Sequence, residues 1–211
     1  MSSPKIAGTL LFIGALTCVI GITIAETQFP GYSTRLNFIS DLASTVSPRT
    51  SITEPAATIW NSTVILFGAM ILSSSYFIHL GFHKLYLTII LAVLGAALVC
   101  VGIFPGDTGT LHVIAALVTF SIGGIAAIVF YKEEKTPLNY ISVAIGIWVL
   151  LALGIGLSSA SMGYESPLRA FFGPGGVERL VTYPILMWAA CFGGHLLSDP
   201  VNTATLTQKK K

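Results

Sequence analysis

Long apolar runs alternate with short polar segments along this chain of 211 residues. A helix needs about 20 apolar residues to cross the hydrocarbon core of a membrane, and the runs are about this long. None of them carries the polar stripe of a helix on the surface of a soluble protein. The pattern therefore predicts an all-α integral membrane protein, a single-domain bundle over residues 1–211 with six transmembrane helices. The predicted spans are residues 6–25, 59–80, 86–104, 111–131, 138–158 and 180–197.

Composition excludes the main alternative, a soluble helical protein with a large core. Hydrophobic residues make up 54% of the chain and charged residues only 9%, whereas soluble domains carry about 25% charged residues. The net charge of +2 is too small to suggest nucleic-acid binding. The three cysteines lie within apolar runs, where a thiol behaves as a small apolar side chain, so no disulfide framework is expected.

The basic residues predict the orientation of the bundle. If the amino terminus is cytoplasmic, every lysine lies on the cytoplasmic side and every arginine lies on the outer side. Cytoplasmic loops are generally the richer in basic residues, and the lysines outnumber the arginines here. We therefore expect a multi-pass protein of the cell membrane with both termini cytoplasmic. The first run is longer than the roughly 7–15-residue apolar core of a signal peptide, so we expect it to be retained.

The connection between the first two spans, residues 26–58, is far longer than the usual connection of about 4–6 residues. It contains the mixed segment NFISDLASTVSP, and its part TRLNFISDLAS has enough apolar residues for a short helix at the interface or between spans. We expect this loop to be ordered, with Asp41 forming a charge-assisted pair with Arg179 or Arg169. Alternatively, Asp41 caps a local turn.

A second group of polar residues lies in the segment FPGDTGTLH, between the third and fourth spans. Asp107 or Thr108 is expected to cap the fourth helix. His112 follows about one turn inside the span, where Asp107 is close enough to fix its tautomer. The alternative is a hydrogen bond from His112 to a neighbouring helix. Pro184 lies inside the sixth span and is expected to kink that helix.

Three motifs together resemble a prokaryotic membrane protein family known as domain of unknown function 998. They are NFISDL after the first span, GIFPGDTGTLH before the fourth and GGVERL at the sixth. The resemblance covers essentially the whole chain and implies a fold and topology, because the family has no established activity. More distantly, FISDLASTVSP is similar to a loop of Frag/DRAM/Sfk membrane proteins, some of which are linked to lipid remodelling; Ala43 replaces their glycine. The family resemblance singles out Asn37, Ser40, Asp41, Pro105, His112, Glu178 and Arg179.

Polar groups at the mouths of membrane helices are usually paired or functional. Glu178 and Arg179 are adjacent, so on a helix they point about 100° apart and each needs a partner from another segment. We predict that the long loop folds over the outer mouth of the bundle and completes one polar pocket, which binds a lipid or a membrane protein partner. The predicted pocket residues are Asn37, Ser40, Asp41, Asp107, His112, Glu178 and Arg179.

Two other function classes remain open. The first is a lipid-modifying enzyme, working by acid–base chemistry at His112 or by zinc at His79, His83 and His195 with Asp199. Against zinc, Gly81 interrupts the histidine pair and Lys84 adjoins it. The second is a small transporter, for which the spans offer few polar residues at mid-membrane.

The remaining sequence signals do not select among these classes. The segment GPGGVER suits either a tight turn or an anion seat at a helix amino terminus beside Arg179. No motif predicts a cofactor. The expected partners are membrane lipids or another membrane protein.

Overall fold

The computed structural model describes residues 1–45, 51–162 and 167–198. In this part of the chain the regular structure is entirely helical, and six helices are long and apolar enough to cross a membrane. The long helices are α1 (Ser3–Thr27), α2 (Ala56–Phe82), α3 (Leu85–Ile103), α4 (Thr110–Val129), α5 (Leu138–Met162) and α6 (Pro167–Ser198). Three short 3₁₀ helices connect them: η1 (Ile39–Ala43), η2 (Gly106–Thr108) and η3 (Phe130–Glu133). The predicted class of an all-α multi-pass membrane protein is confirmed.

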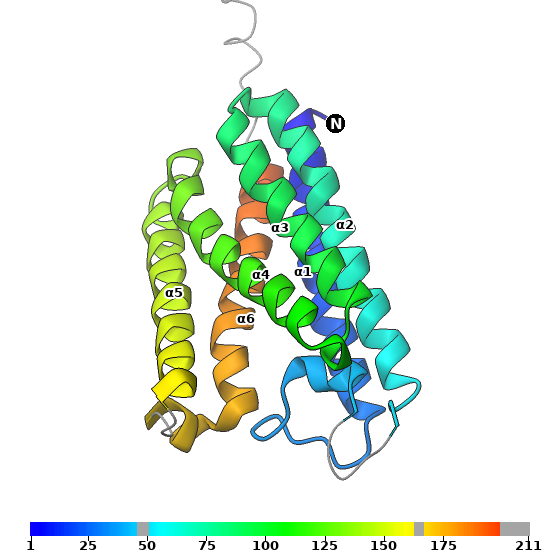
Figure 1. The fold of residues 1–211 in the computed structure, drawn as a ribbon. Helices are drawn as coiled ribbons and strands as arrows, with labels where there is room; N and C mark the ends of the chain where they lie inside the picture. The colour runs from blue at the N-terminus through cyan, green and yellow to red at the C-terminus, as the bar shows by residue number, and fades with distance from the viewer. Residues whose placement is uncertain (46–50, 163–166, 199–211) are drawn as a thin grey trace, which may run out of the picture.

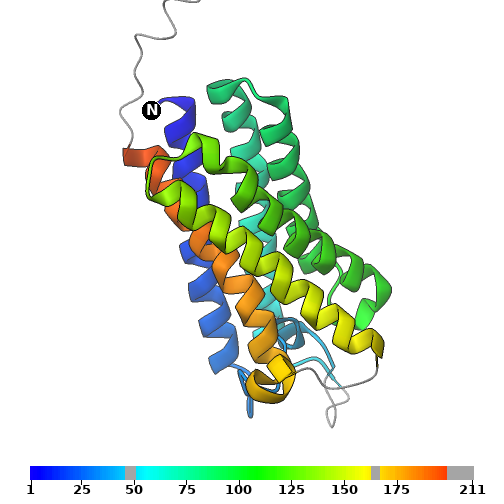
Figure 2. The same ribbon diagram turned by 90° about the vertical axis from the view of Figure 1, so that its left-hand side faces the viewer.

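The helices run up and down and form one bundle (Figure 1). Helix α1 packs against both α2 and α6, and α5 packs against α4 and α6 at the other side. Figure 2 shows α5 and α6 close together at one end of the bundle and diverging toward the other. The start of α1 and the last turn of α6 lie at the same end, which we call the terminal end. The opposite end carries η1 and η2 and is called the loop end.

Small residues allow the helices to approach one another closely. A Cβ atom on Gly8 of α1 would lie 2.6 Å from the carbonyl oxygen of Gly193 in α6. A Cβ atom on Gly68 of α2 would lie 2.8 Å from the carbonyl oxygen of Gly95 in α3. Because lipid chains are as apolar as the helix surfaces, the hydrophobic effect does not drive membrane helices together. Close backbone contact of this kind stabilises their association through dispersion energy.

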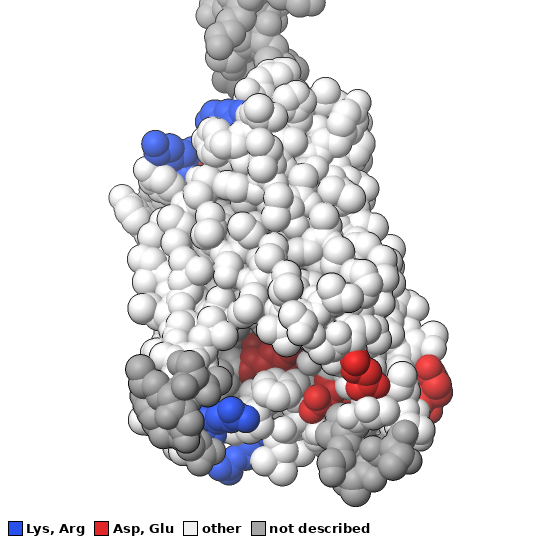
Figure 3. All heavy atoms as spheres, viewed as in Figure 1, with Lys and Arg blue, Asp and Glu red and all other residues white. Residues whose placement is uncertain are grey.

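The charged residues divide between the two ends of the bundle (Figure 3). Lys5, Lys84, Lys132 and Lys135 adjoin the helix ends of the terminal end, whereas Arg35, Arg169 and Arg179 belong to the loop end. The predicted separation of lysine from arginine therefore holds for the described residues. Arg49, Glu165, Asp199 and the three terminal lysines lie outside them, as does Val46, which the expected loop helix included.

The sixth helix differs from its prediction. It begins at Pro167, well before residue 180, and its backbone leaves helical geometry at Gly173, where φ is 73° and ψ is 169°. Pro184 lies inside the helix as predicted, and the kink expected there stays a prediction. The early start was missed because the part of the helix before residue 180 contains the glycines and proline of GPGG, residues 173–176, which lower the apolar signal.

Candidate functional site at the loop end

Arg179 is the centre of the loop end and is buried. Its Nη2 atom donates to Glu26 Oε1 and to the Tyr32 hydroxyl, both at 2.7 Å. Its Nη1 atom donates to the carbonyl oxygens of Thr34 (3.0 Å) and Asn37 (3.1 Å), and to that of Gly175, one turn earlier in α6. One guanidinium thus fastens the end of α1 and the following loop to α6.

Tyr32 completes this arrangement, which we call the Arg179 clamp. Its ring lies 5.6 Å from the guanidinium carbon of Arg179. Burial raises the pKa of Tyr32, although the charge of Arg179 acts in the opposite direction. The hydroxyl therefore stays protonated and donates to the carbonyl oxygen of Phe38 at 2.9 Å. The clamp and this hydrogen bond order the loop through residue 38.

The predicted pair of Asp41 with Arg179 is wrong, because the ion pair of Arg179 is with Glu26. Asp41 instead accepts from the backbone N–H of Phe38 at 2.9 Å and from Asn37 Nδ2 at 3.2 Å. It is the capping residue of η1, which was the alternative prediction. The loop does contain the expected short helix, which buries Ile39 and Leu42.

Two glycines of GPGG are required where the loop crosses α6. Gly173 has a positive φ, and a Cβ atom there would collide with the carbonyl oxygen of Arg35. A Cβ atom on Gly175 would collide with that of Asn37. The backbone N–H of Gly175 donates to the Arg35 carbonyl oxygen at 3.0 Å. The segment is thus a tight crossing point, and loop backbone occupies part of the predicted anion seat.

Asp107 holds the far side of the same loop. Its Oδ1 atom accepts from the backbone N–H of Thr45 at 2.9 Å and from the Thr45 hydroxyl at 3.0 Å. Neither Asp107 nor Thr108 caps α4, since both belong to η2 and Gly109 is the N-cap residue. That prediction is therefore wrong: the carboxylate joins two loops and does not begin a helix.

His112 is fixed by a different partner from the predicted one. Its Nδ1 atom lies 2.8 Å from the carbonyl oxygen of Phe104, at the end of α3. A carbonyl oxygen only accepts, so Nδ1 carries the proton and, in the neutral ring, Nε2 is an acceptor. The tautomer is therefore set by the backbone of a neighbouring helix end, as the alternative prediction held, and not by Asp107.

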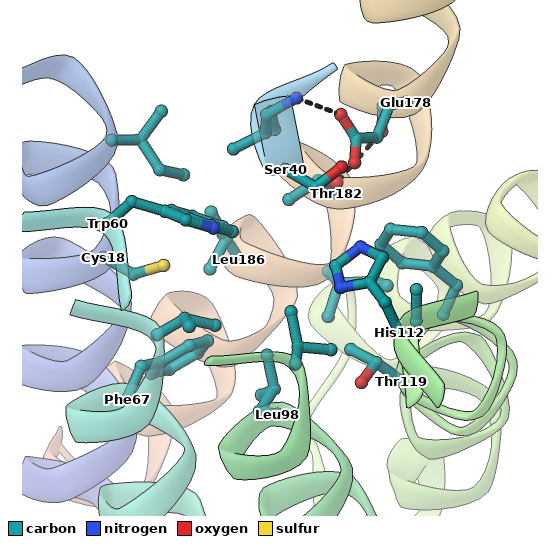
Figure 4. A pocket seen from close by; sticks show the side chains of 17 residues that line it. Cys18, Ser40, Trp60, Phe67, Leu98, His112, Thr119, Glu178, Thr182 and Leu186 are labelled. Atoms are coloured by element: carbon teal, nitrogen blue, oxygen red, sulfur yellow. Dashed lines mark hydrogen bonds between the residues drawn. The ribbon is translucent and has the colours of Figure 1, made fainter. Parts of the chain in front are cut away.

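A cavity of about 60 Å³ lies behind the loop, and His112, Ser40 and Glu178 line it. Figure 4 shows the His112 ring, Glu178 and Trp60 around the same space, brought there by α4, α6 and α2. The remaining walls are apolar, with the hydroxyls of Thr119 and Thr182 among them. The Thr119 hydroxyl is buried and has no hydrogen-bond partner in the described structure.

Glu178 also lines a second space, a groove of about 250 Å³ between α5 and α6. Phe120 is shared by the cavity and the groove in the same way. The groove walls are mostly apolar, and Phe38 and Arg169 lie at its loop-end side. The backbone N–H of Ile39 donates to Glu178 Oε2 and holds the carboxylate at this junction.

The seven predicted pocket residues therefore have two locations. Ser40, His112 and Glu178 line the cavity, whereas Asn37, Asp41, Asp107 and Arg179 make the contacts that hold the loop in place. Sequence reasoning missed the cavity walls supplied by Trp60, Cys18, Thr119 and Thr182. These residue types are common within membrane spans, so no sequence pattern distinguishes them from their neighbours.

The chain matches one family model, described as a protein of unknown function (DUF998), over residues 12–195. The match extends from α1 through most of α6 and includes every residue of the loop end described above. The chain belongs to this family. No curated protein and no solved structure matches it.

The terminal end of this DUF998 protein contains the three histidines of the zinc hypothesis. His83 ends α2 in the left-handed conformation, with φ of 53°, so it does not extend the helical face of His79. His195 Nε2 lies 3.1 Å from the carbonyl oxygen of Glu133 and donates to it. Among the described residues, no three His, Cys, Asp or Glu side chains are grouped as metal ligands. Asp199 lies outside the described part.

Glu134 is a buried carboxylate at the terminal end of this family member. Its Oε1 atom accepts from the Ser142 hydroxyl at 2.9 Å, while its Oε2 atom has no hydrogen-bond partner in the described structure. Burial raises the pKa of Glu134 to about 7, and nearby Ser142 and Trp188 only partly offset it. The neighbouring residue Glu133 forms an ion pair with Lys84 at 2.5 Å.

Proposed function

We propose that this protein binds a membrane lipid at its loop end. The headgroup lies beside Glu178, His112 and Ser40, and an acyl chain lies in the groove between α5 and α6. The observation that carries the proposal is the position of Glu178, which lines both the cavity and the groove. An amphiphile needs such a junction, since its polar and apolar parts must enter different surroundings at one point.

The sizes of the two spaces support this division. By the same measure a water molecule needs roughly 10–15 Å³, so the cavity of about 60 Å³ admits a small polar group and excludes an acyl chain. The groove of about 250 Å³ is larger, and because both spaces have mainly apolar walls, the place of the headgroup is set by the few polar side chains of the cavity, Glu178, His112 and Ser40. Binding sites of this kind place a few fixed polar groups at one end of an apolar cleft.

The orientation is part of the proposal. The described lysines lie at the terminal end and the described arginines at the loop end. Lysine near the cytoplasmic leaflet is stabilised by anionic headgroups. We therefore place the terminal end, with both chain termini, in the cytoplasm and the lipid site at the outer face of the cell membrane.

Two glycines of α5 provide a matched test. Gly156 lines the groove, and a Cβ atom there would have Val177 Cγ1 as its nearest neighbour, at 3.8 Å. Gly154 lies half a turn away, and a Cβ atom there meets nothing within 4 Å. Gly156→Trp should fill the groove and remove lipid that copurifies with the wild-type protein. Gly154→Trp should retain it.

Native mass spectrometry of the gently purified protein measures this directly. We expect stoichiometric lipid on the wild-type protein and on Gly154→Trp, and its loss from Gly156→Trp at unchanged thermal stability. Equal lipid retention by both tryptophan variants, or a wild-type protein without lipid, would refute binding in the groove.

A second candidate function is acid–base chemistry on the bound lipid. The observation that favours it is the tautomer of His112, whose neutral ring has an acceptor nitrogen in a cavity shared with a carboxylate. An enzyme should lose lipid turnover in His112→Ala while retaining the bound lipid. Unchanged lipid after prolonged incubation of the wild-type protein with vesicles would exclude this second function.

A further inference from the structure

We propose that the bound lipid is a zwitterionic phospholipid with a primary-amine headgroup, whose ammonium group binds Glu178 and whose phosphate binds Arg169. This inference rests on the proposed function and names the ligand class of the same site. It follows from the charges at the junction of cavity and groove, and from the number of acceptors that face it.

Glu178 lacks a cationic partner. The only ion pair of Arg179 within the described structure is with Glu26, and its Nη1 atom donates to the loop and to Gly175. Glu178 itself forms no salt bridge with any described residue. A carboxylate within a membrane helix is costly unless a proton or a counter-charge compensates it, and the cavity and groove beside Glu178 leave room for a cation from the ligand to do so.

The carboxylate is held ready for such a ligand. The Ile39 N–H donates to Oε2, and a carboxylate offers about four lone-pair sites in all. Capacity for further donors therefore remains on the side that lines the cavity and the groove. The backbone hydrogen bond fixes the side chain before the ligand arrives.

The other polar groups of the cavity are suited to a donor-rich cation. An ammonium group has three N–H donors and no acceptor. His112 supplies an acceptor nitrogen because Nδ1 donates to the Phe104 carbonyl oxygen. Ser40 adds a hydroxyl to the same lining. A primary ammonium can satisfy these acceptors, whereas a trimethylated amine has no N–H to offer and is bulkier.

Arg169 supplies the complementary charge. It lines the groove together with Glu178 and comes from the first turn of α6, before the break at Gly173. A guanidinium has five donors and suits phosphate oxygens, so it can bind a phosphate while retaining its protein contacts. Figure 3 shows acidic atoms at the floor of a hollow in the loop end and basic atoms at its edge. A headgroup with a phosphate and an ammonium matches this order of charges.

The test is a competition among three lipids with identical acyl chains: phosphatidylethanolamine, phosphatidylcholine and phosphatidylglycerol. Delipidated protein is exposed to vesicles with equal amounts of each, and the bound lipid is identified by native mass spectrometry. The wild-type protein should enrich the ethanolamine lipid over the glycerol lipid by roughly tenfold, the effect of one charge-assisted hydrogen bond. Glu178→Gln should abolish the enrichment, because the amide keeps the acceptor for Ile39 and removes the charge.

Glu134→Gln is the matched control, since it removes the same charge at the terminal end and should leave the preference unchanged. Soluble glycerophosphoethanolamine, which has the headgroup and no acyl chains, should not displace the lipid. Three results would overturn the proposal: a wild-type protein without preference, Glu178→Gln with an undiminished preference, or displacement by the soluble amine. If Gly156→Trp loses lipid while Glu178→Gln keeps the wild-type preference, lipid binding stands and the headgroup assignment fails.

Discussion

Two glutamates at opposite ends of the bundle have the same chemistry and different surroundings. Glu178 at the loop end and Glu134 at the terminal end are both withdrawn from solvent, and neither forms a salt bridge with a described residue. Glu178 lines a cavity and a groove. Glu134 is 8% exposed and lies against Ser142 and Trp188, both of which act to lower its pKa.

The difference shows how a buried carboxylate can be compensated. Space beside Glu178 allows a ligand to bring the counter-charge. At Glu134, which lines neither the cavity nor the groove, a proton is the simplest means of neutralisation. Only the loop end therefore combines an unpaired charge with room for a ligand, and the Arg179 clamp keeps that room open.

The largest expected effect is on the clamp. Arg179→Ala removes one partner of a buried ion pair and leaves Glu26 and two loop carbonyl oxygens without their donor. Such changes cost roughly 3–5 kcal/mol. We expect a large fall in the unfolding temperature of the protein in detergent, measured by intrinsic fluorescence, and loss of bound lipid because the loop no longer covers the cavity.

A double-mutant cycle tests whether the stability lost in Arg179→Ala comes from its ion pair with Glu26. Glu26→Gln should restore part of the stability lost in Arg179→Ala, because it removes the stranded charge. Asp41→Ala should add its own loss without coupling, since its hydrogen bonds are with Asn37 and Phe38. Coupling to Asp41 in place of Glu26 would contradict the described clamp.

The next effect is the pH dependence of stability at Glu134. In the folded protein its pKa is raised from 4.5 to about 7, so the folded state binds a proton more readily than the unfolded state. The contribution to stability is therefore fully present below about pH 4.5 and is lost as the pH rises through 7. Glu134→Gln should exceed the wild type in stability by roughly 1–3 kcal/mol at pH 8 and match it at pH 4.5.

The measurement is the difference in unfolding temperature between Glu134→Gln and the wild type across this pH range. Taking the difference removes the pH dependence of all titratable groups that the two proteins share. Glu178→Gln is measured in the same way for the loop end. Added ethanolamine lipid should raise the unfolding temperature of the wild type and should not raise that of Glu178→Gln. If the difference in unfolding temperature between Glu134→Gln and the wild type stayed constant from pH 4.5 to 8, Glu134 would not be the titrating group proposed for the terminal end.

The six spans could be predicted from sequence because a membrane imposes helix length and apolar composition together. The order of charges along the chain likewise predicted which residues share an end. The partners within an end could not be predicted. Arg179 and Glu26 lie 153 positions apart, and several acids of the loop end were equally plausible until the path of the loop was known. The position of Glu178 and Arg179 at a helix mouth marked both residues in the sequence, but only their contacts show that Glu178 lines the cavity and that Arg179 forms the clamp.

A smaller effect is expected at Ser142, which donates to Glu134 Oε1 at 2.9 Å. This hydrogen bond stabilises the ionised carboxylate and lowers its pKa. Ser142→Ala should therefore move the midpoint of the pH dependence upward and reduce stability at pH 8 by about 1 kcal/mol. The position of the midpoint on the same pH series is the decisive reading, and a downward movement would contradict the assignment.

The smallest effect on stability is expected at Lys84. This test asks whether burial or a neighbouring ion pair determines the pKa of Glu134. Lys84 binds Glu133 at 2.5 Å, a contact that raises the lysine pKa, but 41% of its side chain is exposed. The Glu133 side chain is only 7% exposed, so the stability test replaces both partners: Lys84→Met with Glu133→Gln strands no charge and should hardly alter the unfolding temperature, because pairs with an exposed partner contribute about 0–1 kcal/mol. Desolvation, followed by Ser142 and Trp188, determines the pKa of Glu134. Its pH midpoint should therefore stay in place in Lys84→Met, and a shift would mean that Glu134 depends on a neighbouring cation as Glu178 is proposed to depend on its ligand.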